Sequence, residues 1–520
     1  MNSKIIICNG IHLHKDYKDV LSYSEQDMVT LCQNHALATA NNYSFIRERG
    51  TIQVGIAYST CVQANYIAYQ NSDYSNKWFF AFVDEVRYKN NNTTEIVFTI
   101  DVWSTWFSYI TFNSCFVERE HVTDDTIGLH TVPENLETGE YIITTQVHDN
   151  NNNNVTCVVA STSSPGELAS VYGGYYNGIP SGIAYYRFDD ITGSDNNSLF
   201  SFLSLLASRG KSEAITGMFL CPKWLCGGTT EPISVVIPTS NTVADFTLYC
   251  DPISQVDHYT PKNNKLLTFP YCYYNLTNNQ GANAIYCQEF WETIENKKRV
   301  KVFGCLTPGC SIRAVPVSYK GLTYNYDEGI NLGKLPQLNW TTDQYTNWLT
   351  QNGVNLAVKS ATSAGTLAAG LLGAGATAGA SASMVVSGVS GIANVVGEVY
   401  KHSLIPEQAN GNLNSGDVTT AGERNNFHVY TMTIRQEYAK IIDDYFTARG
   451  YQVNTFKVPN INTRPIFNYV KINNETDSIT GNFANNFTEK LNGILKSGVT
   501  IWHNHDNIDN YSLDNRIVNN

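Results

Sequence analysis

The stretch from Lys77 to Trp106 reads KWFFAFVDEVRYKNNNTTEIVFTIDVWSTW and holds two strand-like runs on either side of an Asn-rich break. In the second run every other position is apolar: Ile96, Phe98, Ile100 and Val102. A period of two predicts a half-buried strand. Because Asn tolerates left-handed backbone conformations, the break predicts a hairpin connection, and the whole stretch predicts antiparallel sheet.

The composition of the whole chain favours the same kind of structure. Its 520 residues include 32 Tyr and 22 Phe, and Val, Ile and Thr are also abundant. Aromatic and β-branched residues favour strands. This length allows two to four domains with a large core. We therefore expect a mainly β fold of the α+β class.

The charge balance excludes one broad class of function. The net charge is −12, whereas proteins that bind nucleic acids in general need Lys and Arg to displace counterions from phosphates. An acidic surface still suits a wall past which nucleic acid slides. The N-terminus, MNSKIIICNG, has an apolar run too short for a signal peptide or membrane anchor, so we expect the chain to fold in a cytoplasm.

The rest of the chain alternates short strands with a few helices. Between about residues 131 and 340, the runs VTCVVA, PISVVIP and RVKVFGC predict strands, and NNSLFSFLSLLASRG predicts one capped helix. Near the C-terminus, HVYTMTI and VTIWH predict strands. RQEYAKIIDDYFTARG and NFTEKLNGILKSG predict amphipathic helices that end at Gly. In the first of these the helically spaced positions are Tyr438, Ile441, Ile442, Tyr445 and Phe446.

One segment differs from everything around it. Residues Ser360 to Gly397 carry no charge and consist largely of Ala, Gly, Ser and Thr. A capped amphipathic helix, TTDQYTNWLTQNG, precedes the segment. We interpret the following sequence as a helical hairpin with arms at about 354–372 and 380–400 around the turn GAGATAG. Each arm of roughly 19 residues is nearly 30 Å long if helical, close to the apolar thickness of a bilayer.

The spacing inside the arms predicts how they pack and what they contact. Small residues four positions apart allow close helix packing, as in membrane helix pairs. These predicted helix-packing residues are Ala361, Gly365, Ala369, Gly373, Gly375, Gly379, Ser383, Ser387 and Gly391. The predicted membrane-insertion residues are Leu367, Leu371, Leu372, Met384, Val385, Val386, Ile392, Val395 and Val396.

Composition alone leaves two interpretations of this segment open. Leu, Ile, Phe and Val are too few for an ordinary transmembrane helix, and each Gly weakens an isolated helix by roughly 1 kcal/mol. A hairpin packed between subunits fits the composition, and so does a segment that enters lipid in only one of its states. A dinucleotide-binding interpretation of GAGATAG, with Glu398 as the ribose-binding acid, fails because helix-like sequence precedes the motif.

Cysteine and histidine pairs raise the question of a metal. Cys221/Cys226 in CPKWLC and Cys305/Cys310 in CLTPGC share one spacing, and two such pairs could build a tetrathiolate zinc site. HLHKD and WHNHD place His12 with His14 and His503 with His505, pairs that would share a face on strands. Buried thiols and surface or packing histidines explain these patterns more simply. We predict no metal and no other cofactor.

Catalytic motifs are missing from the sequence. It contains no nucleophile elbow, no zincin helix and no phosphate-binding loop, and its carboxylates show no spacing typical of an acid–base pair. The sequence therefore predicts a protein that is not an enzyme.

Several stretches resemble the tail-knob proteins of small, short-tailed, podovirus-type bacteriophages. They are the opening stretch with its continuation FVEREHV, then RGYQVNTFKVPNINTRPIFNYVK, and finally SGVTIWHNHDNIDNYSLDN. The resemblance is specific around residues 78–122 and 450–515. The apolar segment matches the family's hydrophobic loop in position and composition.

The resemblance implies a domain plan. Residues 1–130 and 411–520 would form one β-rich tube domain built from both chain ends. Residues 131–340 would be an inserted, mainly β region, and 341–410 would hold the capped helix and the membrane-active loop. Pairing between strands from the two ends would close the wall and remove exposed sheet edges.

It also implies a function in the virion. The family forms a homohexameric distal tail tube that joins other tail proteins at the upper tail or connector and conducts viral DNA without binding it specifically. Its loops plug the lumen and, once released, penetrate the host cytoplasmic membrane. We therefore expect a structural virion protein of the tail, assembled in the host cytoplasm. The alternative is a host receptor-binding or cell-wall-degrading tail protein.

Overall fold

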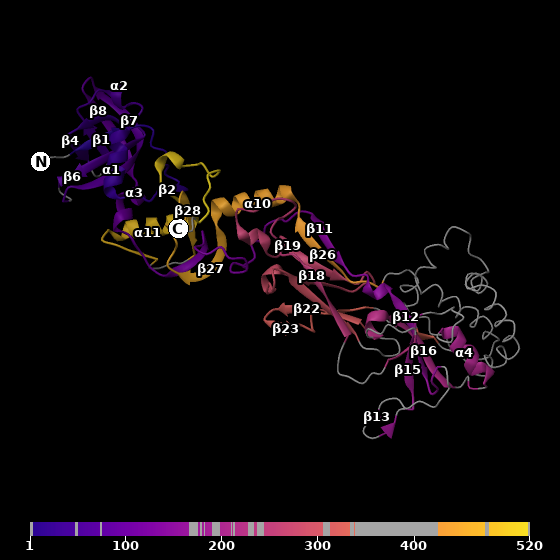
Figure 1. Cartoon of the computed structure of the whole chain (residues 1–520). Coiled ribbons are helices and arrows are strands. Elements are labelled where there is room, and N and C mark those ends of the chain that lie inside the picture. Colours follow the sequence, from indigo (N-terminus) through magenta and orange to yellow (C-terminus); the bar gives the residue numbers. More distant parts are fainter. Residues whose placement is uncertain are drawn as a thin grey trace, which may run out of the picture. The chain divides into compact units, whose positions relative to one another are not determined.

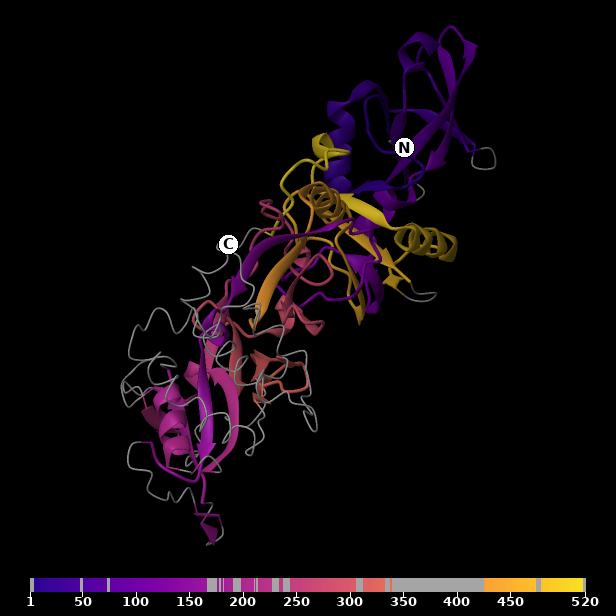
Figure 2. The same cartoon turned by 90° about the vertical axis from the view of Figure 1, so that its right-hand side faces the viewer.

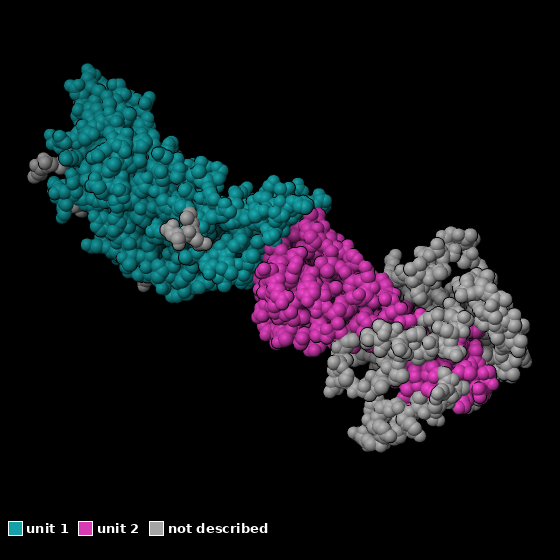
Figure 3. All heavy atoms as spheres, viewed as in Figure 1, with its two compact units in different colours: residues 1–141, 254–271, 434–520 teal, residues 142–253, 272–433 magenta. Residues whose placement is uncertain are grey.

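The computed structural model describes residues 4–46, 50–72, 75–165, 175–176, 179–180, 182–189, 198–209, 211, 214–226, 233–236, 244–304, 312–332, 337–338, 425–473 and 478–517 (Figure 1). The chain divides into two compact units (Figure 3). Unit 1 comprises Met1–Tyr141, Ser254–Tyr271 and Ile434–Asn520, and unit 2 comprises Ile142–Ile253 and Cys272–Thr433. The four predicted domain ranges remain predictions.

The first sheet of unit 1 has seven strands, all paired antiparallel, in the order β3-β1-β6-β7-β8-β5-β4. The strands are β1 (Ile5–Cys8), β3 (Ala36–Ala40), β4 (Tyr43–Ile46), β5 (Thr51–Val54), β6 (Tyr66–Asn71), β7 (Lys77–Asn90) and β8 (Thr93–Ile100). Side chains of β1 alternate between two apolar clusters, with Ile6 in one and Ile5 and Ile7 in the other. Both faces of this sheet are therefore packed.

The predicted hairpin is confirmed, with one correction at its end. β7 and β8 pair antiparallel across a two-residue turn, and Ile96 and Phe98 are buried. Val102, predicted on the same strand face, instead begins the helix α3 (Val102–Trp106). The reason is a cap: the Asp101 side chain accepts a hydrogen bond from the Ser104 N–H, which starts the helix one residue after the strand.

The second sheet of unit 1 joins the two ends of the chain. Its order is β2-β30-β28-β10-β27, so each of the N-terminal strands β2 and β10 pairs with C-terminal strands. The strands are β2 (Asp19–Leu21), β10 (Cys115–Glu120), β27 (Tyr451–Lys457), β28 (Phe467–Ile472) and β30 (Val499–Trp502). Figure 2 shows the yellow C-terminal elements beside the indigo and purple N-terminal ones. Trp502 and Phe467, with ring centroids 4.6 Å apart, share a core cluster with Met28 and Phe80.

Four further helices and one short strand pair complete unit 1. They are α1 (Glu25–Asn34), α2 (Tyr58–Cys61), α10 (Gln436–Arg449) and α11 (Asn485–Ser497), with β9 (Thr111–Phe112) paired to β29 (Ile479–Thr480). The two predicted C-terminal helices are thus confirmed as α10 and α11. The apolar residues of α10 differ in burial, however. Ile442 and Phe446 are buried, whereas Ile441 is 68% exposed.

Buried charges hold the three stretches of unit 1 together. The Glu134 carboxylate is fully buried and forms ion pairs with Arg119 and Lys265, whose side chains are also largely buried. Arg119 and Glu134 come from the first stretch and Lys265 from the second, and the N–H of Gln452, in the third stretch, donates to the Glu134 carboxylate at 2.8 Å. A buried carboxylate between two cations avoids the high cost of an unpaired charge in the interior. Three segments distant in sequence are therefore fixed around one ionic group.

The described residues of unit 2 form three larger sheets and one small hairpin. Their strand orders are β11-β26-β19-β20, β17-β15-β12-β16-β25 and β18-β21-β22-β23, with β24 paired to β22 and β13 to β14. The strands are β11 (Tyr141–His148), β12 (Val155–Ser161), β13 (Tyr175–Tyr176), β14 (Ile179–Pro180), β15 (Ala184–Phe188), β16 (Ile215–Pro222), β17 (Ile233–Val236), β18 (Ala244–Cys250), β19 (Cys272–Thr277), β20 (Asn283–Tyr286), β21 (Lys298–Gly304), β22 (Ile312–Tyr319), β23 (Leu322–Tyr324), β24 (Ile330–Asn331), β25 (Gln337–Leu338) and β26 (His428–Ile434).

The helix predicted in the inserted region is α4 (Leu199–Ser208). It packs on the sheet that contains β12 and β16, where Phe202 stacks on Phe188 and lies in one apolar cluster with Leu206 and Leu220. Across the described residues strands dominate over helices, so the predicted mainly β, α+β fold class is confirmed.

Candidate functional site: the two anchors of the apolar segment

The predicted functional residues, from Ala361 to Val396, lie outside the residues that the structure describes, and so does the predicted helix before them. The structure therefore brings none of them together. It does describe the two places where this part of the chain joins the folded protein. We name them the departure anchor, at Gln337–Leu338, and the return anchor, at residues 425–427.

The departure anchor is a pair of backbone strands. β25 pairs antiparallel with β16, so that Leu338 lies opposite Met218 and Gln337 lies opposite Phe219. Upstream of this point, the N–H of Leu332 donates to the carbonyl of Ile312 at 2.8 Å. The departure anchor is thus the edge strand of a five-stranded sheet.

The return anchor is built around a buried carboxylate. Asp149 is 4% exposed, and its carboxylate accepts hydrogen bonds from the N–H groups of Phe427, at 3.2 Å, and Asn151, at 2.9 Å. Burial raises the pKa of Asp149, and these donors oppose the shift. The Asn153 side chain accepts from the Asn425 N–H at 3.2 Å. Phe427 itself is fully buried, so the returning chain is fixed by both polar and apolar contacts.

Residues near the return anchor were not predicted as functional. The polar run 150–154 contains the short helix η4 (Asn151–Asn153). Asn152 is fully buried, donates to Asp149 and accepts from the Trp224 indole N–H at 2.9 Å. A run of Asn between strands gives no sign of such a partner, because the partner lies about 70 residues away in sequence.

The departure anchor pairs directly with β16, whereas the return anchor is linked to the end of β16 through the side chains of Asp149, Asn152 and Trp224. The body of β16 pairs with β25, and its C-terminal end leads into η6 (Lys223–Cys226), which carries Trp224. The N–H of Lys223 also donates to the carbonyl of Asn154 at 2.8 Å. The departure anchor thus belongs to the sheet that contains β16, whereas the return anchor leads into β26, a strand of the sheet β11-β26-β19-β20.

A histidine pair neighbours the return anchor. The rings of His148 and His428 stack with centroids 5.8 Å apart, and Gln146 hydrogen-bonds to His428 Nδ1 at 2.9 Å. Burial, and to a lesser extent the nearby His148, lowers the pKa of His428. His428 is therefore favoured in its neutral form.

Neither of the two histidine pairs that the sequence suggested as metal ligands lies on a strand. Instead, His12 and His505, one from each pair, pack against each other. His12 and His14 lie in a loop, and His503 follows β30. The His12 N–H donates to His505 Nε2 at 3.2 Å, and the His505 ring stacks on the His12 ring. Within the described parts of the chain, no group of three or more His, Cys, Asp or Glu residues is arranged to hold a metal ion.

The cysteine pairs can be compared only in part. Cys305 and Cys310 lie outside the described residues. Cys221 and Cys226 are both buried, and their Sγ atoms are 3.2 Å apart. The second pair needed for a tetrathiolate site is therefore not placed by the structure.

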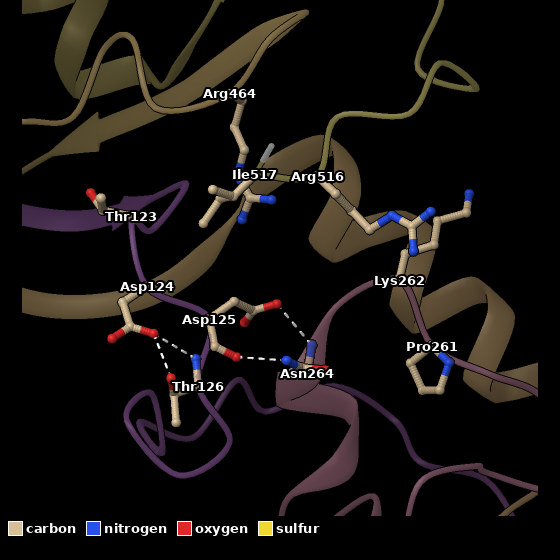
Figure 4. A pocket seen from close by; sticks show the side chains of 10 residues that line it. All are labelled: Thr123, Asp124, Asp125, Thr126, Pro261, Lys262, Asn264, Arg464, Arg516 and Ile517. Carbon is tan, nitrogen blue, oxygen red and sulfur yellow. Dashed lines mark hydrogen bonds between the residues drawn. The ribbon is translucent and has the colours of Figure 1, made fainter. Parts of the chain in front are cut away.

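Unit 1 contains a polar hollow of about 450 Å³ (Figure 4). Its carboxylates are engaged with nearby backbone groups: Asp124 accepts from the Thr126 N–H at 2.9 Å, and Asp125 accepts from the Asn264 N–H at 3.0 Å. Arg464, which is 6% exposed, donates to the Asn515 carbonyl at 3.2 Å. Acidic and basic groups line the same space, and their bonds connect distant chain segments rather than forming an acid–base pair.

No helix among the described residues is both long enough and apolar enough to cross a membrane.

Comparisons with known proteins give the chain its family. Residues 239–516 match the family model of the C-terminal domain of the tail knob protein gp9 of Bacillus phage phi29. Residues 1–111 match the N-terminal model of caudoviral major tail proteins. The two matches together cover both ends of the chain.

Relatives match over nearly the whole length. The tail knob protein gp9 of Bacillus phage PZA is 26% identical, and that of phage phi29 is 25% identical, with 91% of both chains covered in each case. The tail knob protein gp9 of Bacillus phage B103 is 24% identical over 98% of both chains.

A solved structure has the same fold. The tail knob protein gp12 of bacteriophage C1 superposes with a TM-score of 0.64 at 15% identity, covering 99% of this chain and 100% of that one. With the sequence matches, this places the chain in the phage tail. The chain belongs to the bacteriophage tail knob protein family, and it is a structural component of the virion tail rather than an enzyme.

Proposed function

We propose that this chain forms a homohexameric distal tail tube for viral DNA, in which residues 360–397 of each copy plug the lumen and, on release, enter the host cytoplasmic membrane. The observation that carries the proposal is a long uncharged segment whose nearest described neighbours on each side are both fixed within unit 2, at Gln337–Leu338 and at residues 425–427. A segment held in this way can change its environment while the rest of the subunit stays folded.

The charge of the chain fits a conduit. A wall lined by Lys and Arg would retain DNA through its phosphates, and binding of this kind strengthens steeply as salt falls. A net charge of −12 favours a neutral or acidic wall past which DNA moves without specific binding. The upper tail or connector proteins are the partners expected at the other end of such a tube.

The composition of the segment fits reversible exposure. Its Leu, Val, Ile and Met side chains provide apolar area for lipid, while Gly, Ala and Ser allow helices to approach closely. The same residues make each isolated helix only marginally stable, as required of a segment that is packed in one state and inserted in another. Inserted segments from six copies would share one pore.

Charged substitutions test the membrane step. The double variant Leu371→Asp with Val386→Asp places two charges within the uncharged segment; on insertion scales, a charge at the centre of an inserted helix costs roughly 2.5–3.5 kcal/mol. We expect assembly to be normal and leakage of dye from lipid vesicles to be lost. The matched control places the same two charges at exposed positions, Leu322→Asp with Val458→Asp, which are 52% and 50% exposed. Leakage by the control should equal that of the parent chain.

Deletion of residues 360–397 separates the two interpretations of the segment. A membrane segment is dispensable for assembly, so the shortened chain should form normal particles that do not permeabilise vesicles. A shortened chain that fails to assemble would instead support a packing hairpin between subunits. Leakage that persists after deletion would assign permeabilisation to another part of the chain.

A further inference from the structure

Two cysteine thiols are in contact where β16 ends and the following turn begins. Cys221, in β16, and Cys226, at the end of η6, are fully buried and 8% exposed respectively. Their Sγ atoms are 3.2 Å apart. An S–S bond is about 2.0 Å long, so the sulfurs must approach by roughly 1.2 Å to be joined. A movement of this size lies within the adjustment of side-chain torsions.

We propose that Cys221 and Cys226 are a redox modification site, which forms a reversible intramolecular disulfide and stiffens the return anchor of the apolar segment. A tail assembled in a reducing cytoplasm would carry the dithiol, and a virion outside the cell would carry the disulfide. The proposal does not depend on membrane insertion, since it concerns only a turn within unit 2.

The reaction is thiol–disulfide exchange with a small disulfide of the glutathione class. The thiolate of Cys226, the less buried of the two, attacks one sulfur of the small disulfide, forms a mixed disulfide and releases one small thiol. The thiolate of Cys221 then attacks Cys226 Sγ and displaces the second small thiol. Two electrons pass from the protein sulfurs to the small disulfide, and the two protein protons are taken up by the released thiolates.

A third thiol nearby is a poorer partner. Cys157, on β12, is fully buried, and burial raises the pKa of its thiol, with Cys226 as a further cause. The thiolate is the reactive species, so a raised pKa slows the attack by Cys157. Cys226 also lies in the same short turn as Cys221, which limits the backbone movement needed to join them.

The disulfide would act on the anchor through Trp224. This residue lies between the two cysteines, and its indole N–H donates to Asn152, which in turn donates to Asp149. The Trp224 ring also packs edge-on against Phe246, with centroids 5.2 Å apart. Closing the six-residue ring restricts the turn, so openings that release Asn152 and the Phe427 N–H become rarer.

The test uses the full chain under native conditions with oxidised or reduced glutathione. Remaining thiols are blocked after denaturation, and the protein is digested with trypsin. Because trypsin cuts between Lys223 and Trp224, a bridge from Cys221 to Cys226 keeps two peptides joined until they are reduced. We expect this pair of peptides from the parent chain and from Cys157→Ser, and its absence from Cys226→Ser.

Hydrogen exchange measures the effect on the anchor. Oxidation should slow amide exchange at residues 151–154 and 425–427 on the order of tenfold in the parent chain, and should leave it unchanged in Cys226→Ser. The proposal is overturned if Cys226 is found joined to Cys157, if the two thiols stay unlinked while other cysteines react, or if exchange at the anchor does not change on oxidation.

Discussion

At the scale of single residues, His121 shows how the interior of unit 1 depends on pH. Its ring is 1% exposed, its Nε2–H donates to the Thr447 carbonyl at 2.9 Å, and its Nδ1 accepts from the Tyr469 N–H at 2.8 Å. These two hydrogen bonds form only with the neutral imidazole ring, because one ring nitrogen must donate while the other accepts. Burial, helped by the positive charge of Arg464, lowers the pKa of His121 to about 3.

The consequence is a loss of stability in mild acid. The unfolded chain binds a proton at His121 near pH 6.5, well before the folded chain does, so the stabilisation is complete above that pH and declines as the pH falls towards 3. Between pH 6.5 and 5 we expect a loss of about 2 kcal/mol from this residue. Urea unfolding of the chain and of His121→Gln at both pH values measures it. Equal pH slopes in the two proteins would contradict the assignment.

At the scale of elements, we expect substitution by Ala to have opposite effects on stability at two glycines. Gly450 ends α10 with φ +63°, and a Cβ there would lie 2.2 Å from the Glu120 carbonyl oxygen. Gly493 lies within α11, and among the described residues nothing is within 4 Å of the position of its Cβ. Gly450→Ala should lower the free energy of unfolding by more than about 2 kcal/mol, and Gly493→Ala should raise it by roughly 0.5–1 kcal/mol. If thermal unfolding shows that Gly450→Ala does not destabilise the chain, the close contact between Gly450 and the Glu120 carbonyl is refuted.

The sequence predicted local structure well where a period or a cap was present. The β7–β8 hairpin, α4, α10 and α11 followed from alternation, helical spacing and terminal Gly. Val102 was misplaced because alternation alone does not reveal that Asp101 caps a helix. The pairing of β10 with β27 and β28 could be expected only from the family resemblance, because nothing local in these strands identifies a partner more than 300 residues away.

The candidate site could be predicted only in part. The absence of charged residues identified 360–397 as a candidate functional segment from the sequence alone. Asp149, Asn152 and Trp224 carried no signal, because hydrogen bonds between distant polar residues leave no period in the sequence. The anchors therefore emerged only from the fold.

At the scale of the whole molecule, the account predicts six copies around a central hole. Tail knob relatives define the family, and a tube closed by several subunits removes free sheet edges. Native mass spectrometry should find a particle of six times the chain mass, and electron microscopy should show sixfold symmetry. A stable monomer at high protein concentration would contradict the tube.

The most direct measurement asks which residues contact lipid chains. Vesicles that contain a lipid with a photoreactive acyl chain are permeabilised by the purified protein, irradiated, and the protein is digested with trypsin. The segment lies between Lys359 and Lys401, and no Lys or Arg occurs between them, so it is recovered as one peptide of residues 360–401. The account predicts that acyl-chain adducts concentrate in this peptide. Adducts confined to other peptides, in vesicles that leak, would contradict the central claim.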